Sequence, residues 1–121
     1  MKEYLSVFFE DKNKIALVAE ENKRIIGYAL GSIRSFPVFI SQTKTCHFDE
    51  AFVIPEHRKK GVGGQLFSVL AKWARSKKAS GITATVDARN KSSLAAWKKL
   101  GFHTIKFKNK VEIGMRFDNS L

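Results

Sequence analysis

A basic, glycine-rich loop stands between a strand-like segment and a helix-like segment of this chain. Residues 44–54 (KTCHFDEAFVI) are rich in β-forming residues and stop at Pro55, which has no N–H for a sheet ladder. Residues 62–79 place apolar side chains on one face of a helix, which Ser80-Gly81 is expected to end. The sequence RKKGVGG, residues 58–64, lies between the two segments. This order predicts an α/β fold in which the loop leads directly into the first turn of the helix.

The remaining segments predict a mixed α/β sheet with flanking helices. The further elements are a β-hairpin over 14–33 turned at EENKR, a strand over 82–86, a helix over 92–100 closed by Gly101, and two strands over 103–108 and 111–117 around Asn109-Lys110. The predicted order is therefore β-β-β-α-β-α-β-β. A length of 121 residues without a linker or an internal repeat predicts a single domain over 1–121.

The chain carries a large excess of positive charge. Its 22 lysines and arginines exceed its 11 aspartates and glutamates, which gives a net charge of +11 at pH 7. A surplus of this size attracts anions such as nucleic acids, membranes or phosphorylated small molecules. The apolar run from Leu5 to Phe9 is too short for a signal peptide or a membrane span, so we expect a cytoplasmic protein without a membrane partner.

The cysteine and the histidines predict neither a disulfide nor a metal site. Cys46 is the single cysteine and lies in a β-rich run, where a small buried side chain is expected. His47 and His103 do not have the spacing that is typical of metal ligands. We therefore expect a protein without a bound metal.

The glycine-rich loop has the features of an anion-binding site. The first turn of a helix leaves about four backbone N–H groups unpaired, and the helix dipole adds roughly half a positive charge there. Gly61, Gly63 and Gly64 have no side chains that would keep a ligand from these groups, and the RKK segment adds full charges. We expect a phosphate or pyrophosphate at this helix start. The P-loop pattern does not fit, because no Lys-Ser or Lys-Thr follows these glycines. The dinucleotide-binding pattern does not fit either, because Leu66 stands where it needs a glycine.

Three segments together resemble the GNAT N-acetyltransferase superfamily. Residues 58–63 fit the Arg-x-x-Gly-x-Gly form of its motif A, and DEAFVIPEHR, residues 49–58, is similar to the strand that enters this motif. Downstream, NKSSLAAWKKLGF, residues 90–102, is similar to the family segment Asn-x-x-Ala-x-x-x-Tyr-x-x-x-Gly-Phe. The resemblance extends over about residues 14–117 and implies a GNAT-type mixed, mostly antiparallel sheet with flanking helices.

The resemblance implies an enzyme that transfers an acetyl group from acetyl-CoA to a primary amine by direct attack. It implies that the pyrophosphate rests on the loop backbone, that nearby lysines meet the 3′-phosphate, and that the strand before the loop binds the pantetheine arm. Asn90 and Ser93 would lie at the pantetheine or in its neighbourhood, and Trp97 would pack against the thiol end. The implied cofactor-binding residues are Phe52, Val53, Ile54, Arg58, Lys59, Lys60, Gly61, Val62, Gly63, Gly64, Asn90, Ser93 and Trp97.

The resemblance also implies that Asp49 or Glu50 is the catalytic base that takes the proton of the amine. Asp49 is slightly favoured, and a relay through water is an open alternative. Adjacent residues on a strand point to opposite faces, so at most one of the two carboxylates is expected to face the pocket. Trp97 holds the position where the family often has a tyrosine, and an indole N–H cannot protonate a leaving thiolate.

The N-terminal segment departs from the usual family pattern of a strand and one or two helices before the hairpin. Only about a dozen residues precede the hairpin in this sequence. Either the N-terminal strand is absent, or YLSVFFE, residues 4–10, is the remnant of the second helix. We therefore expect a fold shortened at its N-terminus, with an acceptor pocket that is unusually open or is completed by a partner subunit, as in a homodimer.

Two other functions compete with catalysis. A non-catalytic module that holds an acyl-CoA would share the loop, and Trp97 with the short N-terminal segment is consistent with it. A nucleic-acid-binding domain would use the positive charge, but the aromatic residues are at core-like positions and do not alternate with basic residues as in a stacking platform. We rank this function last. The basic surface disfavours a polycationic acceptor and leaves a protein N-terminus, a lysine side chain or a small metabolite as alternatives.

Overall fold

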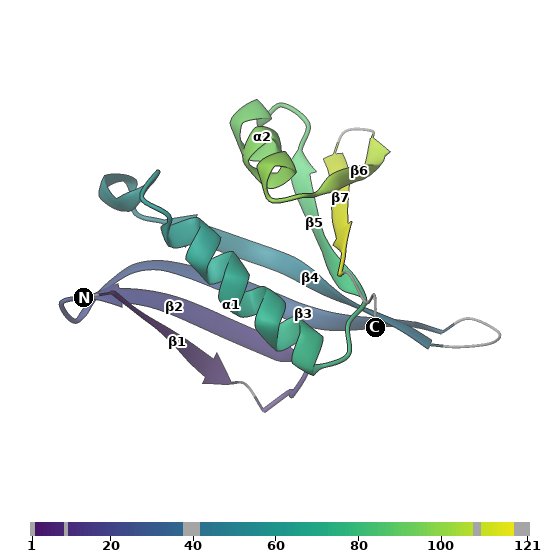
Figure 1. Cartoon of the computed structure of the whole chain (residues 1–121), viewed down its shortest axis with the longest axis horizontal. Helices are drawn as coiled ribbons and strands as arrows, with labels where there is room; N and C mark the ends of the chain where they lie inside the picture. The colour runs from purple at the N-terminus through teal and green to yellow at the C-terminus, as the bar shows by residue number, and fades with distance from the viewer. Residues whose placement is uncertain (1, 9, 38–41, 108–109, 118–121) are drawn as a thin grey trace.

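The computed structural model describes residues 2–8, 10–37, 42–107 and 110–117. In chain order its elements are β1 (Lys2–Phe8), β2 (Lys14–Glu21), β3 (Arg24–Pro37), β4 (Gln42–Val53), the 3-10 turn η1 (Pro55–His57), α1 (Val62–Ser76), β5 (Gly81–Asp87), α2 (Lys91–Lys99), β6 (His103–Phe107) and β7 (Lys110–Arg116). The strands form one seven-stranded sheet in the order β1-β2-β3-β4-β5-β7-β6 (Figure 1). Among the strand pairs of the described residues, β4 and β5 are the one parallel pair. The prediction of a mixed, mostly antiparallel sheet with flanking helices is confirmed.

Helix α1 packs lengthwise over β2, β3 and β4 (Figure 1). Its buried side chains are Val62, Leu66, Leu70, Ala71 and Ala74, which recur at helical spacing and form one face. Full burial of one such leucine contributes about 1.5–3 kcal/mol to stability. Gly31 of β3 has no side chain and so leaves room for Leu70. A Cβ at this position would lie only 2.6 Å from Leu70 Cδ1, which is too close. The core therefore lies between α1 and one face of the sheet.

The end of α1 differs from the sequence prediction. The helix ends at Ser76, and the chain turns at Lys78, whose φ of 68° lies in the left-handed region. Gly81 opens β5 instead of ending the helix, and an added Cβ there would collide with the carbonyl oxygen of Met115. The interpretation of Ser80-Gly81 as the helix stop is therefore wrong, because the glycine is needed for the close approach of β7.

The second helix agrees better with the sequence prediction. Helix α2 covers Lys91–Lys99, and Gly101 follows it with a φ of 101°, which confirms this glycine as the closing residue. In the strand pair that comes next, Lys110 is the first residue of β7. Asn109, the other residue of the predicted turn, lies outside the described residues.

Residues 2–8 form a strand, so neither N-terminal alternative is right. Strand β1 pairs antiparallel with β2 in a continuous register, from Lys2 opposite Glu21 to Phe8 opposite Ile15. Among the described residues, β2 follows β1 without a helix between them. Compared with the usual family pattern, the strand is present and the one or two helices after it are missing. Residues 4–8 of YLSVFFE are therefore no helix remnant, since they pair with β2. Phe9 lies outside the described residues.

Strands β4 and β5 separate shortly after they meet. Their parallel ladder consists of Cys46 opposite Ile82, His47 opposite Thr83 and Phe48 opposite Ala84. Beyond these pairs the two strands diverge, so that α1 lies on one arm of a V and α2 on the other (Figure 1). The β3–β4 register shifts between Leu30 and Gly31, which oppose Glu50 and Phe48, and leaves Asp49 in a bulge. In the described part of the chain, no helix is long and apolar enough to span a membrane.

Candidate active site

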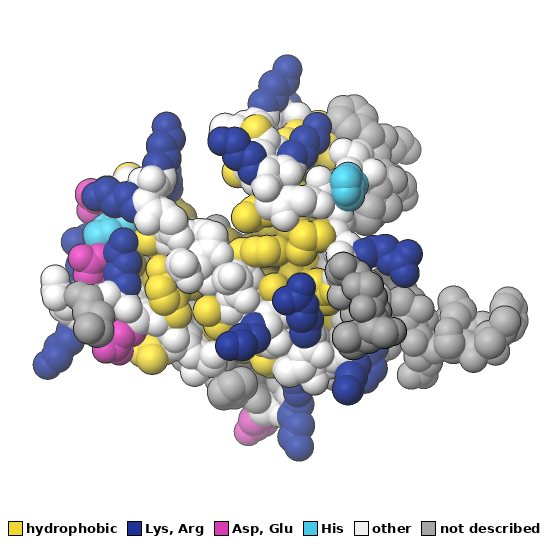
Figure 2. All heavy atoms as spheres, viewed as in Figure 1, with side chains coloured by type: hydrophobic (Ala, Val, Ile, Leu, Met, Phe, Trp, Pro, Cys, Tyr) yellow, Lys and Arg dark blue, Asp and Glu magenta, His cyan; other side chains and the backbone are white. Residues whose placement is uncertain are grey.

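An aromatic cluster joins the two arms of the V. The Trp97 ring of α2 lies edge-on to Phe48 of β4 and Phe102, with centroid distances of 4.9 and 4.7 Å. Phe67 of α1 contacts the same cluster, 5.6 Å from Phe102. Edge-to-face pairs of this kind add to the stability gained from burial alone. Figure 2 shows hydrophobic side chains on the floor of the hollow between the two arms. Trp97 therefore connects α2 to β4 through this cluster.

The predicted anion site has an open geometry. Gly61 is the N-cap of α1 with a φ of 85°, and no side chain caps the first turn, which also lacks acidic residues. A Cβ added to Gly61, Gly63 or Gly64 would meet no atom within 4 Å. Packing therefore gives no reason for Gly63 and Gly64 to be glycine inside a helix, where glycine costs about 1 kcal/mol relative to alanine. What they provide is access to the amides of the helix start.

The segment before the glycines is fixed to the neighbouring hairpin. His57 Nδ1 lies 3.6 Å from Glu21 Oε2, and Arg24 Nη2 lies 3.4 Å from Glu56 Oε2. Both contacts tie η1 to the β2–β3 hairpin. Two sets of contacts thus position the start of α1. Ion-pair contacts hold the preceding turn η1 to the hairpin, and the buried face of α1 packs on the sheet.

Arg58 is engaged with the end of β4. Its Nε donates a hydrogen bond of 2.8 Å to the Val53 carbonyl, and its guanidinium lies 5.3 Å from the centre of the Phe52 ring. Arg58 therefore braces the loop, and its side chain is directed at the strand. Lys59 and Lys60 are exposed beside the helix start. The side chains of these two lysines are therefore the exposed cations beside the helix start, whereas that of Arg58 is engaged with β4.

On the other arm, Asn90 has a structural role. Its Oδ1 accepts a hydrogen bond of 3.1 Å from the Ser93 amide and caps α2. This contact accounts for the spacing of Asn90 and Ser93 without a ligand. Both residues nevertheless lie on the α2 arm of the V, as does Trp97.

The two carboxylates of β4 point to the same face of the sheet. The Ser32 hydroxyl donates a hydrogen bond of 3.1 Å to Asp49 Oδ1, and the Tyr28 hydroxyl donates one to Glu50 Oε2. Tyr28 and Ser32 are four residues apart on β3 and share one face, while Gly31 faces α1. The expectation that the two side chains point to opposite faces is wrong, because the bulge at Asp49 interrupts the alternation. Of the two, Asp49 lines a hollow of this face, and Glu50 is not among its lining residues.

This face of the sheet holds groups of defined charge. The hydrogen bond to Glu50 raises the pKa of Tyr28 above its usual value, so the phenol is protonated at neutral pH. Burial lowers the pKa of His47, whose Nδ1 lies 2.9 Å from Thr83 Oγ1, and favours a neutral imidazole. Arg34 Nη2 lies 3.6 Å from Asp49 Oδ1. The face opposite α1 can therefore bind an ammonium group and accept its proton.

Residues 1–102 match the family model described as the acetyltransferase (GNAT) family. The chain belongs to the GNAT acetyltransferase family. It is 27% identical over 101 residues to the uncharacterized N-acetyltransferase YhfO of Bacillus subtilis (strain 168), a match that covers 82% of this chain and 65% of that protein. It is 36% identical over 87 residues to the L-amino acid N-acyltransferase MnaT of Escherichia coli (strain K12), covering 71% of this chain and 48% of that protein. The chain thus spans less than two thirds of the length of both relatives.

The GNAT fold is also shared with solved structures. One is the aminoglycoside N-acetyltransferase AAC(6')-Iy in complex with CoA, with a TM-score of 0.72 and 24% sequence identity. The match covers 79% of this chain and 72% of that one. At this identity the likeness shows the fold alone, and it agrees with the seven-stranded sheet and the two helices described above.

Several residues of this GNAT site were not predicted from the sequence. Tyr28, Ser32 and Arg34 on β3 contact the carboxylates, and Phe67 belongs to the aromatic cluster. The alternation along β3 was available in the sequence and places the first three on one face. The partner strand and its register, which bring them to Asp49 and Glu50, are tertiary features and have no local signal.

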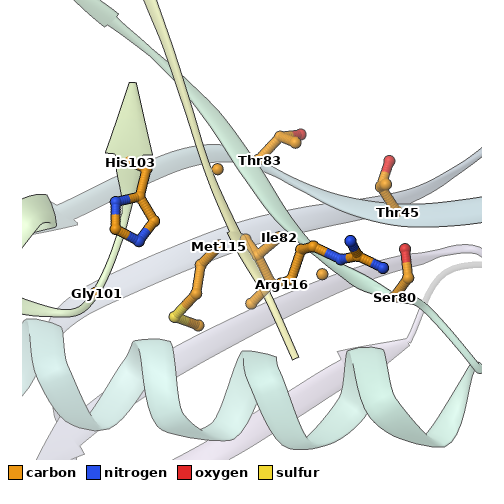
Figure 3. A pocket seen from close by; sticks show the side chains of 10 residues that line it. Thr45, Ser80, Ile82, Thr83, Gly101, His103, Met115 and Arg116 are labelled. Atoms are coloured by element: carbon orange, nitrogen blue, oxygen red, sulfur yellow. The ribbon is translucent and has the colours of Figure 1, made fainter. Parts of the chain in front are cut away.

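One cavity of this GNAT family member lies away from the glycine loop. It has a volume of about 580 Å³ and is drawn mainly from β5, β6 and β7 (Figure 3). Its lining residues are Thr45, Ser80, Gly81, Ile82, Thr83, Gly101, His103, Gly114, Met115 and Arg116. None of the predicted site residues is among them. The predicted site residues lie instead at the open helix start, on β4 and on α2.

Among the described residues, no group of three or more His, Cys, Asp or Glu side chains is placed to hold a metal ion. We assign no metal-ligand set to this GNAT chain, and the expectation of a protein without metal stays a prediction.

Cys46 is expected to be unreactive in the folded protein. The side chain is fully buried under α1, and burial raises the pKa of the thiol to about 12. At about pH 8 only about one thiol in ten thousand would be the reactive thiolate. Incubation with a thiol reagent should therefore leave the native protein unlabelled and modify it fully in denaturant, as measured by mass spectrometry. Rapid labelling of the native protein would contradict the buried position.

Proposed function

We propose that the chain is an N-acetyltransferase that transfers an acetyl group from acetyl-CoA to a primary amine by direct attack. The observation that carries the proposal is the open start of α1. Its amides have no side-chain cap, its glycines have space above them, and Lys59 and Lys60 stand beside it. A diphosphate is the anion that such a helix start binds well. Membership of the GNAT family and the names of both relatives support the same activity.

The residues proposed to hold the cofactor lie on both arms of the V. The backbone of residues 58–64 would bind the pyrophosphate, and Lys59 and Lys60 would meet the 3′-phosphate. Phe52, Val53 and Ile54 would offer backbone groups to the pantetheine arm, because the β5 side of this part of β4 has no ladder partner among the described residues. The Val53 carbonyl already accepts a hydrogen bond from Arg58, so it would not be one of these groups. The Ile54 N–H already donates to the Ile26 carbonyl and the Ile54 carbonyl already accepts from the His57 N–H, so Ile54 would line the arm without a free backbone group. Asn90, Ser93 and Trp97 would form the opposite wall.

Acetyl-CoA supplies an acetyl group activated as a thioester. This chain would bring the amine to it from the other face of the sheet, where Asp49 and Glu50 lie. The gap between β4 and β5 would connect the two faces, which allows attack without an acetyl-enzyme intermediate. Asp49 is our first candidate for the base and Glu50 the second. A protonated amine cannot attack, so removal of its proton by a placed carboxylate speeds the reaction.

The proposal is tested by calorimetric titration of CoA and acetyl-CoA, followed by a thiol-release assay with a panel of amines. We expect binding of both nucleotides and release of CoA that depends on the acceptor. Absence of binding at millimolar nucleotide would contradict the proposal. Binding without CoA release from any amine would favour the non-catalytic acyl-CoA module, with which Trp97 in place of a tyrosine is consistent. The buried Cys46 would not interfere with a thiol reagent in this assay.

A further inference from the structure

The face of the sheet opposite α1 carries two hollows around Arg34. One, of about 410 Å³, is lined by residues that include Lys14, Ser32, Arg34 and Asp49. The other, of about 310 Å³, shares Arg34 and continues across β5 with His47 and residues 83–85. Arg34 thus lies between the two hollows and within 3.6 Å of the carboxylate proposed as the base. Acceptor binding at this face would place the molecule against both charges.

The Arg34–Asp49 contact leaves most of the hydrogen-bonding capacity of both groups unused. Its N–O distance of 3.6 Å is longer than that of a charge-assisted hydrogen bond, and the two side chains are 52% and 34% exposed. Exposed ion pairs of this kind stabilise a fold little. A guanidinium has five N–H donors in a planar fork that fits a carboxylate in two places. In the described part of the chain, Asp49 is the one carboxylate that Arg34 contacts.

We propose that the acceptor carries a carboxylate next to its amine, as a free α-amino acid does, and that Arg34 binds this carboxylate while Asp49 binds the ammonium. The inference rests on the proposed N-acetyltransferase function. A zwitterion has its two charges at the spacing of adjacent functional groups, which complements a neighbouring arginine and aspartate. Binding exchanges one long, exposed ion pair for two shorter ones with the ligand. Arg34 is then a specificity-determining residue.

The other charges of this face agree with that assignment. Lys14 lines the same hollow and adds a second positive charge to the carboxylate side. His47 stays neutral and does not compete with the ammonium for Asp49. Glu112 lines the far hollow, beyond His47 and β5. A second amine on the acceptor would meet Arg34 and Lys14, so a polyamine is a poor fit, and a peptide N-terminus lacks the adjacent free carboxylate.

The experiment measures CoA release by the full chain with a series of L-amino acids, each compared with its own carboxamide. We expect the wild-type protein to prefer acids over amides in kcat/KM. Arg34→Gln should raise KM for the acids about 10- to 100-fold, the range expected for a lost charged hydrogen bond. For the amides it should change KM less than about threefold, since the lost contact is to the carboxylate. Arg34→Lys should recover part of the preference, because the charge remains without the fork.

The control is Arg75→Gln, which removes an arginine from the outer side of α1. Arg75 lies 4.6 Å from the Phe117 ring and far from the carboxylates, so the ratio of acids to amides should match wild type. If wild type releases CoA with amines but treats acids and amides alike, the inference is overturned and the proposed function stands. If titration shows no binding of acetyl-CoA, the proposed function fails, and the inference fails with it.

Discussion

Gly63→Val is expected to weaken CoA binding at least about 100-fold while the fold survives. Gly63 is in the first turn of α1, and a Cβ there meets no atom within 4 Å, so the substitution has room in the protein. The same space is where we propose that the pyrophosphate lies, and a branched side chain would cover the amides. Each hydrogen bond to a charged group is worth about 1.5–3 kcal/mol. Losing two of them would cost about 3–6 kcal/mol, which is about a hundredfold or more in affinity.

Calorimetric titration of CoA and thermal unfolding of the same sample separate the two effects. The matched control is Ser68→Val, which places the same side chain at an exposed position further along α1. Both variants should keep the unfolding temperature of wild type within a few degrees, because in a helix valine is no worse than glycine and about equal to serine. The control should keep its affinity as well. Equal affinity of Gly63→Val and wild type would mean that the cofactor does not bind at this helix start.

The sequence predicted the loop and its two flanking elements because each rests on a strong local pattern. Apolar residues at helical spacing and Pro55 before the glycines placed α1 and the end of β4 within a few residues. The signal for β1 was weaker. Its described apolar residues, among them Tyr4 and Leu5, follow one another instead of alternating, since an edge strand is only partly covered. The pairing with β2 that defines this strand cannot be read locally.

The arrangement of the carboxylates was not predictable for a related reason. Alternation along β4 would separate Asp49 from Glu50, and one extra residue in the β3–β4 ladder places them together. Nothing in DEAFVI marks that bulge. Its position depends on which residues of β3 lie opposite, and the same register brings Tyr28 and Arg34 to the site. Sequence patterns thus predicted the cofactor side, where one loop carries the function, and missed the acceptor side, which is assembled from two strands.

The divergence of β4 and β5 is the feature that would bring the cofactor on one face of the sheet into contact with the acceptor on the other. Both segments read as ordinary strands, and the separation after Phe48 and Ala84 has no sequence signature. Packing accounts for it. Trp97 of α2 lies against Phe48, the last β4 residue paired with β5, so aromatic rings fill the space where the two strands separate. The tryptophan that cannot act as an acid by proton transfer therefore has a structural role in the site.

Asp49→Asn is expected to lower kcat by about 10²–10⁴-fold at neutral pH, the usual contribution of a general base. Glu50→Gln should lower it less than about tenfold, because the glutamine carbonyl can still accept the hydrogen bond of Tyr28. The two variants are matched controls for each other, since both keep the shape of the side chain and remove one charge from the same face. Affinity for acetyl-CoA should be unchanged in both, because neither residue is proposed to bind it.

The pH dependence distinguishes a base from a residue that only positions the acceptor. Below its pKa, which is about 8 for the N-terminal amine of a peptide and about 10.4 for a lysine side chain, the amine needs help to lose its proton. The adjacent carboxylate of a free α-amino acid raises the pKa of its amine above the peptide value. As pH rises toward that value, solution supplies the neutral amine, and the defect of Asp49→Asn should shrink by about tenfold per pH unit. A defect that stays constant with pH would mean that Asp49 positions the acceptor. A larger loss in Glu50→Gln would make Glu50 the base, and no loss in either would leave deprotonation to water.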